Sequence, residues 1–343
     1  MKPLNFAVFG AGFWANFQLA GWLEIDGVKP VAIVDKVRSK AEKLADKFGI
    51  KHVYNDAEEL LDKHAHELDF IDIITDIDTH LTFAKMGAER GLDVVCQKPM
   101  ASSINDAVEM VNFCHEKNVR LFINENFRWQ SLNREVKSMI EDKVVGDLFK
   151  VRISFCTAFP VFDNQPALAE LDQFILTDCG PHGMDLCRFL FGEARTMYCL
   201  IKTVNPTIKG EDVANVLMEM ENGIHCFAEY SFSSILEEES FPQYTMLLEG
   251  TTGSIKVEPH GKVTVTTKEG SEKMKIEPES YSWADPEYMI IHSSIVAAQR
   301  DILVGLKGGN AQTTGDDNLN TIRLIYASYE SAATGEVIEM KDF

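Results

Sequence analysis

Short apolar runs alternate with amphipathic segments in the first third of the chain. Up to about residue 124, each apolar run is followed by a segment whose apolar residues recur at helical spacing. In residues 104–118, for example, Ala107, Val108, Val111 and Cys114 fall on one face. The strands predicted from the runs are residues 6–9, 31–34, 53–54, 69–75, 94–96 and 120–123. This alternation predicts an α/β domain, residues 1–124, with a parallel sheet covered by helices on both faces.

The pattern changes after residue 124. Helices are predicted at residues 132–142, 181–191, 287–306 and 316–334. Alternating apolar and polar residues predict strands at 148–157, 197–203, 213–220, 225–232, 244–250, 253–258 and 262–267. Turn signals such as Glu221-Asn222-Gly223 join several of these strands. We therefore predict a second, α+β domain over residues 125–343, built on a large, mainly antiparallel open sheet.

The first apolar run ends in the turn Gly10-Ala11-Gly12-Phe13-Trp14-Ala15. Gly10 permits the sharp turn, Gly12 lets a pyrophosphate approach the backbone, and Ala15 lets the next helix pack closely against the strand. Such a turn between a strand and a helix is typical of the Rossmann dinucleotide-binding fold, although glycine pairs also occur in ordinary turns. The residues predicted to bind the cofactor phosphates are Gly10, Ala11, Gly12, Phe13 and Trp14.

An acidic residue follows the second apolar run at the spacing that a dinucleotide site requires. Asp35 lies about twenty residues after the glycines, where a carboxylate can accept hydrogen bonds from the adenosine ribose. The alternative is that Asp35 merely caps the next helix. A carboxylate here repels the 2′-phosphate of NADP, so it favours NAD as the cofactor. Lys36 and Arg38 offer positive charge nearby and weaken that preference.

Composition narrows the classes of partner and compartment. The 343 residues carry a formal charge of −20, which argues against nucleic acid or an anionic membrane as a partner. We expect no apolar run to span a bilayer and see no signal peptide before the first strand. The seven cysteines show no close-spaced pair. We therefore expect a cytoplasmic protein with reduced thiols. The nine histidines lack a metal-binding spacing, so no metal site is expected, and His64 and His66 are interpreted as a polar helix end.

Two segments carry side chains suited to proton transfer. Lys98, in Gln97-Lys98-Pro99, follows a predicted strand and should point toward the ligand crevice, unless it is a surface lysine before a helix-starting proline. Asp178 and His182 are four residues apart near a predicted helix start, and a histidine beside a carboxylate suits proton transfer at neutral pH. The alternatives for this pair are a helix cap and a core histidine.

Residues 124–129 could contact a polyol. Asn126 and Arg128 supply amide and guanidinium groups directly after the last strand of the first domain, and the alternative is a joint between the two domains. Loops at residues 159–174 and 234–243 are expected to set specificity.

Together these segments resemble the glucose-fructose oxidoreductase / inositol dehydrogenase / rhizopine-catabolism (Gfo/Idh/MocA) family over nearly the whole chain. The landmarks are Gly10, Gly12, Ala15, residues 41–49, Ile74-Thr75 with His80, Lys98-Pro99, Asn126-Phe127-Arg128, Asp178-x-Gly180-x-His182-x-x-Asp185 and residues 329–335. The resemblance implies an enzyme that transfers a hydride between NAD or NADP and a sugar, sugar-acid or cyclitol hydroxyl or ketone.

The resemblance also implies roles for single residues. Lys98, Asp178 and His182 would form the catalytic group. Thr75, His80, Gln97 and Lys98 would contact the cofactor, and Asn126, Arg128, Asp178 and His182 the substrate. The chain departs from the family pattern at Gln97, where Glu is usual, and at Asp76, where Pro is usual. The first departure removes a negative charge beside Lys98.

Two other functions remain open at this point. The chain could be a regulator that senses a nucleotide or sugar without turnover, although Lys98, Asp178 and His182 together argue for an enzyme. It could also be a glycosidase that uses NAD for transient oxidation. Relatives pack the second-domain sheet face to face, so we expect a homodimer or homotetramer. An apolar sheet face would carry Val216, Met218, Met220, Tyr230 and Phe232, unless these residues cover the domain's own helices.

Overall fold

The computed structural model describes residues 2–237 and 244–343, and these form two compact units. The first unit holds the chain up to Asn126 together with Ser280–Asp285 and His292–Ile322. The second holds Phe127–Glu279, Pro286–Ile291 and Arg323–Phe343. Part of the expected specificity loop at 234–243 lies outside the described residues.

The first unit contains a six-stranded parallel sheet in the order β3-β2-β1-β4-β5-β6. Its strands are β1 (Leu4–Phe9), β2 (Val28–Val34), β3 (His52–Tyr54), β4 (Phe70–Ile73), β5 (Asp93–Gln97) and β6 (Leu121–Asn124). Its helices include α1 (Ala15–Leu23), α2 (Arg38–Phe48), α3 (Ala57–His64), α4 (His80–Glu89) and α5 (Ile104–Glu116). This strand order confirms the predicted doubly wound sheet, in which ligands bind where the order reverses, here between β1 and β4.

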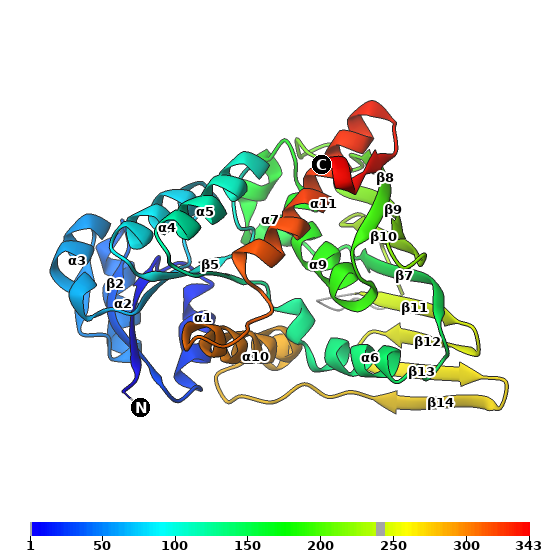
Figure 1. Ribbon diagram of the computed structural model, residues 1–343, viewed down its shortest axis with the longest axis horizontal. Coiled ribbons are helices and arrows are strands. Elements are labelled where there is room, and N and C mark those ends of the chain that lie inside the picture. Colours follow the sequence, from blue (N-terminus) through cyan, green and yellow to red (C-terminus); the bar gives the residue numbers. More distant parts are fainter. Residues whose placement is uncertain (1, 238–243) are drawn as a thin grey trace. The chain divides into compact units, whose positions relative to one another are not determined.

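Side chains on the two faces of β1 fill two layers of core. Phe6 stacks on Phe70 with ring centroids 4.8 Å apart, beside Trp22 of α1. On the other face Phe9 packs edge-on against Phe83 of α4, with centroids 5.3 Å apart. Within this unit, α4 and α5 cover one face of the sheet while α1 lies on the other (Figure 1).

The carboxyl-terminal part of α10 (Met289–Leu306) completes the first unit, a difference from the predicted division that assigned everything after residue 124 to the second domain. Ile302 and Leu306 join the core that holds Phe6. The approach of α10 to α1 is close, because a Cβ on Gly21 would lie 2.5 Å from Oε1 of Gln299. The physical reason for the difference is that the α1 face of the sheet needs a cover that the first 126 residues do not supply.

This helix also changes the expectation about membranes. The segment Pro286–Leu306 has the length and composition to cross a bilayer, with a mean hydropathy of 1.3, whereas we expected no such run. Within the most apolar 18-residue stretch of this segment, 67% is buried inside the folded chain, as in the core helix of a globular protein.

The second unit is built on a nine-stranded sheet in the order β14-β13-β12-β11-β7-β10-β9-β8-β15. The strands are β7 (Leu148–Cys156), β8 (Ala194–Lys202), β9 (Val213–Met220), β10 (His225–Ser231), β11 (Thr245–Gly250), β12 (Gly253–Glu258), β13 (Lys262–Thr267), β14 (Gly270–Lys275) and β15 (Ile338–Glu339). All neighbouring pairs are antiparallel except β7 and β10. The prediction of a mainly antiparallel open sheet is confirmed, and β14 and β15 were not predicted.

Helices of the second unit are α6 (Ser131–Glu141), α7 (Val161–Asn164), α8 (Ile175–Asp178), α9 (Gly180–Phe191) and most of α11 (Gly315–Thr334). Short 3₁₀ segments across the chain are η1 (Ala65–Glu67), η2 (Ile77–Thr79), η3 (Phe127–Trp129), η4 (Pro166–Glu170), η5 (Pro286–Tyr288) and η6 (Met340–Asp342). Helix α9 packs on β10 and β7, and Gly183 lets it do so because a Cβ there would lie 2.2 Å from Oη of Tyr230.

The apolar face read from the sequence is the inner one. Val216, Met218, Met220 and Tyr230 are buried within the unit, at most 3% exposed, and Phe232 stacks on Phe174 with centroids 5.6 Å apart. These residues cover the unit's own helices, which was the alternative interpretation. The expectation that they form a face for another subunit is corrected, since the alternation of a strand identifies two faces without showing which one is covered.

Candidate active site

The glycine turn has the geometry that a dinucleotide site requires. Gly10 has a φ of +104°, and a Cβ on it would lie 2.4 Å from the carbonyl oxygen of Ile74, so a glycine is needed here. Gly12 differs, because a Cβ there would meet nothing within 4 Å. The open space at Gly12 lies at the start of α1, whose N-cap residue Trp14 makes no side-chain cap. This combination leaves room for an anion at the positive end of the helix dipole.

Asp35 binds the glycine turn through its carboxylate. Its Oδ2 accepts a hydrogen bond of 2.7 Å from the Ala11 amide, and its Oδ1 accepts one of 2.7 Å from the Val37 amide. The N-cap of α2 is Val37, so the capping interpretation of Asp35 does not describe the structure. A carboxylate has about four lone-pair positions, so Asp35 can still accept hydrogen bonds from a ribose.

The two cations nearest to Asp35 in sequence have carboxylate partners. Nζ of Lys36 lies 3.3 Å from Oδ2 of Asp76. Nε of Arg38 lies 2.9 Å from Oε1 of Glu42. Asp76, which replaces the proline usual at this position in the resembling family, therefore provides the partner of Lys36. These pairs are exposed and weak, but they lower the positive charge offered to a 2′-phosphate.

His80 joins the ends of two central strands. Its Nδ1 lies 3.0 Å from the carbonyl oxygen of Pro99, and its Nε2 lies 3.1 Å from that of Thr75. The Lys98–Pro99 peptide bond is cis. The ring is 1% exposed, and burial lowers its pKa. His80 is thus placed to hold the backbone after β4 and β5, and any direct contact with a cofactor stays a prediction.

A chain of buried amides runs from the interior to Lys98. Oδ1 of Asp72 accepts a 2.7 Å hydrogen bond from Nε2 of Gln18. Gln18 in turn accepts a short one through Oε1 from Nε2 of Gln97. Finally, the Lys98 amide donates to Oε1 of Gln97 over 3.3 Å. Trp22 also donates to Asp72, over 2.8 Å.

The direction of this chain is fixed at both ends. An ionised Asp72 can only accept, and the backbone N–H of Lys98 can only donate. Both glutamines must therefore point their amide nitrogens toward Asp72 and their oxygens toward Lys98. Asp72 is 0% exposed, and burial raises its pKa to about 7 despite the hydrogen bonds from Gln18 and Trp22. The sequence analysis missed Asp72, although a charged residue inside the apolar strand Phe70–Ile73 was a usable signal.

The second unit positions His182 from two sides. His182 lies in the first turn of α9, four residues after Asp178, which ends α8. The ring of Phe127 stacks on His182 with centroids 3.8 Å apart and an angle of 11° between the planes. Both Asp178 and His182 are half-buried. Phe127 was noted in the sequence only as part of a motif, and its stacking role was missed.

Arg128 is held by a buried carboxylate. Its Nε donates a 2.8 Å hydrogen bond to Oδ2 of Asp185, and its Nη2 donates to Oδ1 of the same residue. Arg128 is 5% exposed and Asp185 0% exposed. This two-pronged pair fixes η3 against α9 and so orients Phe127 and His182. A direct contact of Arg128 with substrate stays a prediction.

The predicted site residues fall into two groups. Asn126 belongs to the first unit, where its Nδ2 donates a 2.8 Å hydrogen bond to Oγ of Ser294. The first unit also contains the predicted cofactor-binding residues Gly10, Ala11, Gly12, Phe13, Trp14, Asp35, Thr75, His80, Gln97 and Lys98. Arg128, Asp178 and His182 belong to the second unit. The meeting of Lys98 with Asp178 and His182 is an expectation from the sequence that neither unit tests by itself.

Comparison with known proteins supplies the family. A model described as "Oxidoreductase family, NAD-binding Rossmann fold" matches residues 4–125, and one for the GFO/IDH/MocA C-terminal domain matches residues 133–256. The chain is similar to a D-apiose dehydrogenase from Rhizobium rhizogenes, with 36% identity over 99% of this chain and 98% of the relative. A D-apiose dehydrogenase from Paraburkholderia graminis is 35% identical over 99% of this chain and 91% of the relative.

A solved structure agrees over the same length. An oxidoreductase from Agrobacterium radiobacter, in complex with NAD⁺, L-tartaric acid and magnesium, superposes with a TM-score of 0.95. It is 36% identical to this chain, and 99% of each chain is covered.

Proposed function

This chain belongs to the GFO/IDH/MocA oxidoreductase family, and from that premise we propose that it oxidises a hydroxyl of a small sugar such as D-apiose, or reduces the matching ketone or lactone. It is an NAD(P)-dependent dehydrogenase acting on CH–OH groups of sugars. The observation that carries the proposal is the likeness to two D-apiose dehydrogenases over almost the full length.

The residues of the first unit fit NAD as the cofactor. Bound NAD supplies a carbon that accepts or returns the hydride. The open space at Gly12 and the uncapped start of α1 suit its pyrophosphate. Asp35 suits the adenosine ribose of NAD and opposes the 2′-phosphate of NADP, since the cations of Lys36 and Arg38 already have carboxylate partners.

In the proposed mechanism, three side chains share the transfer of the hydroxyl proton and the binding of the substrate. Lys98 donates a hydrogen bond to the reacting oxygen and so stabilises an alkoxide or polarises a carbonyl. His182 takes the hydroxyl proton or returns it, with Lys98 sharing that role, and Asp178 orients the pair or binds a neighbouring hydroxyl. The stacking of Phe127 on His182 limits rotation of the imidazole, which favours a fixed proton path. This assignment requires Lys98 to reach the same substrate as His182.

A panel of substrates tests the function. D-Apiose, D-xylose, levoglucosan and myo-inositol are each offered with NAD and with NADP, and NADH or NADPH formation is followed by absorbance. We expect turnover on at least one sugar and a higher kcat/KM with NAD. Loss of a glycoside without net NADH would favour the NAD-dependent glycosidase. Cofactor binding with no reaction on any sugar would favour the regulator.

Two substitutions test the catalytic group. Lys98→Met and His182→Ala should each lower kcat by about a hundredfold or more, because each removes a proton-transfer group. Lys43→Met and His225→Ala are matched controls on exposed surfaces of the same units. Losses below about tenfold, with cofactor affinity intact, would remove the proposed roles.

We also propose that the protein is cytoplasmic and forms a homodimer or homotetramer through the outer face of the second sheet. Exposed apolar side chains on that face are Leu200, Leu217 and Leu247. The formal charge of −20 supports the proposal that the protein binds neither nucleic acid nor an anionic membrane, because both would be repelled.

A further inference from the structure

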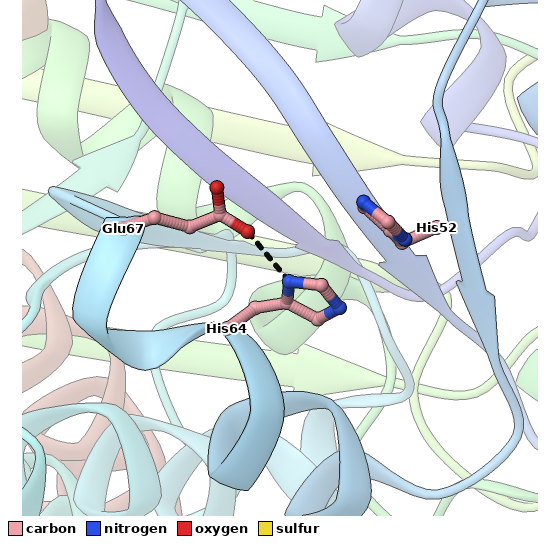
Figure 2. Close-up of side chains that lie close together, drawn as sticks. All are labelled: His52, His64 and Glu67. Carbon is pink, nitrogen blue, oxygen red and sulfur yellow. Dashed lines mark hydrogen bonds and ion pairs between the residues drawn. The ribbon is translucent and has the colours of Figure 1, made fainter.

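Two histidines and a glutamate lie together at the edge of the first sheet. His52 is the first residue of the edge strand β3, His64 is the last residue of α3, and Glu67 ends η1. Figure 2 shows the three side chains, with His64 and Glu67 on consecutive helical segments and His52 on the strand beside them. None of these residues belongs to the proposed catalytic group or the glycine turn.

The possible ligand atoms of the three side chains converge. One nitrogen from each histidine and one carboxylate oxygen of Glu67 all lie within 4.8 Å of one another. Nδ1 of His64 is 2.6 Å from Oε1 of Glu67. The rings of His52 and His64 have centroids 4.2 Å apart. Ligands around a tetrahedral zinc ion lie about 3.4 Å apart, given bonds of about 2.1 Å. Changes of about 1.4 Å or less in the separations of these ligand atoms would give that spacing.

Neighbouring groups hold the candidate ligands in place. The Tyr54 hydroxyl lies 2.9 Å from Nε2 of His64. If a metal occupies Nδ1, the Nε2–H can donate to Tyr54, which is the supporting hydrogen bond common around metal-bound histidines. The Asn5 side chain donates a 2.9 Å hydrogen bond to the backbone carbonyl of Glu67. These hydrogen bonds already restrict His64 and the backbone of Glu67, so metal binding loses less conformational entropy.

Charge at the site also favours a cation. The carboxylate of Glu67 adds negative charge, and His64 ends α3, where the helix dipole is negative. Lys63 is the nearest competing cation on the same helix, and its Nζ lies 2.6 Å from Oε1 of Glu59.

We propose that His52, His64 and Glu67 form a binding site for a divalent transition metal such as Zn²⁺. Two imidazoles and one carboxylate select Zn²⁺, Co²⁺, Ni²⁺ or Cu²⁺ over Mg²⁺ and Ca²⁺, which prefer oxygen ligands alone. Three protein ligands leave one tetrahedral position for water. The metal joins the edge strand to the end of α3, so its role is to stabilise that edge.

Calorimetric titration with ZnCl₂ tests the site in untagged, chelator-treated protein. We expect one high-affinity Zn²⁺ per chain and no such event with MgCl₂. His52→Ala and His64→Ala should each weaken Zn²⁺ binding by more than about tenfold. His66→Ala is the matched control, because His66 is exposed and lies on the same segment outside the trio. Equal affinity in the wild type and both histidine variants would overturn the proposal.

A second measurement guards against a histidine variant that folds poorly. Glu67→Gln keeps the size of the side chain and a hydrogen-bond acceptor for His64. In this variant Zn²⁺ should raise the Tm less than it raises the Tm of the wild type. Co²⁺ added to wild-type protein should give the visible absorption of a tetrahedral site, and this absorption should weaken in Glu67→Gln. A Zn²⁺-induced rise in Tm and a Co²⁺ spectrum that are both unchanged in Glu67→Gln would remove Glu67 from the site.

Discussion

At the scale of single residues, Asp72 is a fully buried carboxylate outside the predicted catalytic group. It is the acceptor that orients Gln18 and Gln97, so it determines which atom of Gln97 faces Lys98. The resembling family usually carries a glutamate where this chain has Gln97. A carboxylate is still present in this region, but here it lies deeper in the sheet and acts through two amides.

Asp72→Asn should therefore impair catalysis. An asparagine has only one oxygen for the two donors from Gln18 and Trp22. Where its nitrogen faces Gln18, the two amides can satisfy residue 72 or the Lys98 N–H, but not both. At pH 8, where Asp72 is ionised, we expect kcat/KM to fall about tenfold, a loss of about 1.4 kcal/mol. Steady-state kinetics measures it. Asp69→Asn is the control, because Asp69 directly precedes β4, the strand that contains Asp72, but is exposed. Equal kcat/KM for the two variants would contradict the role of the chain of amides.

The same carboxyl group predicts a pH dependence of stability. Burial raises the pKa of Asp72 to about 7 from an ordinary value of 3.8, so the folded state binds its proton more tightly than the unfolded state. The stabilising contribution is full below about pH 4, falls as the pH rises to about 7, and is constant above that. Urea unfolding between pH 4 and 8 should show this decline in the wild type and a flatter profile in Asp72→Asn. Parallel profiles would contradict the raised pKa.

Some of these residue roles could be read from the sequence and others could not. Gly10, Gly12 and Asp35 occupy fixed positions in a local strand–turn–helix–strand pattern, so spacing alone located them. The amide chain and the pair of Arg128 with Asp185 join residues 50 or more positions apart. Local patterns do not encode such pairings, and Arg128 was consequently expected to contact substrate or to belong to a joint between the domains, not to pair with Asp185.

At the scale of elements, the turn between β1 and α1 needs its two glycines for different reasons: Gly10 for its backbone conformation and Gly12 for the space it leaves. Gly10→Ala should destabilise the protein by about 1–3 kcal/mol, because the residue needs a positive φ and meets the Ile74 carbonyl. Gly12→Ala should leave the Tm nearly unchanged, since its Cβ meets no protein atom, but should raise the Kd for NAD by occupying the phosphate approach. Thermal unfolding and fluorescence titration with NAD measure both. An unchanged NAD affinity in Gly12→Ala would contradict the placement of the pyrophosphate.

The elements themselves were predictable to different degrees. The parallel sheet followed from alternating strands and helices and was confirmed, whereas its strand order was not predicted. β14 was missed because its residues, Gly270–Lys275, are mostly polar and exposed, so no apolar alternation marks them. The position of α10 was missed because its apolar surface fits any uncovered core, and its partner α1 is more than 250 residues away.

At the scale of the whole molecule, the outer face of the second sheet carries a row of side chains suited to association. Register places Tyr198, Leu217, Phe227, Arg152 and Leu247 side by side on five neighbouring strands. Leu217 is 44% exposed, and Leu247 is 36% exposed. A row of this kind supports the proposed homo-oligomer, because exposed apolar rows often lie in subunit interfaces.

Leu217→Asp should shift the protein toward smaller species. A carboxylate in the middle of an apolar interface loses hydration without gaining a partner, so we expect the dimer or tetramer to weaken. Light scattering at several concentrations measures the mass. Leu200→Asp, on the neighbouring strand β8, tests whether the interface extends beyond the row. A wild type that is monomeric at high concentration would contradict the proposed assembly.

The return of α10 to the first unit restricts how this protein can be divided. A chain shortened to residues 1–126 would keep every landmark of the nucleotide fingerprint yet leave the side of α1 that carries Gly21, which faces Ile295 and Gln299 of α10, open to water. Exchange of modules between related enzymes faces the same restriction, because an exchangeable piece must also carry residues 292–322. The residues predicted to recognise the nucleotide form one continuous segment of the gene, but the structural unit that keeps them folded is encoded in several segments.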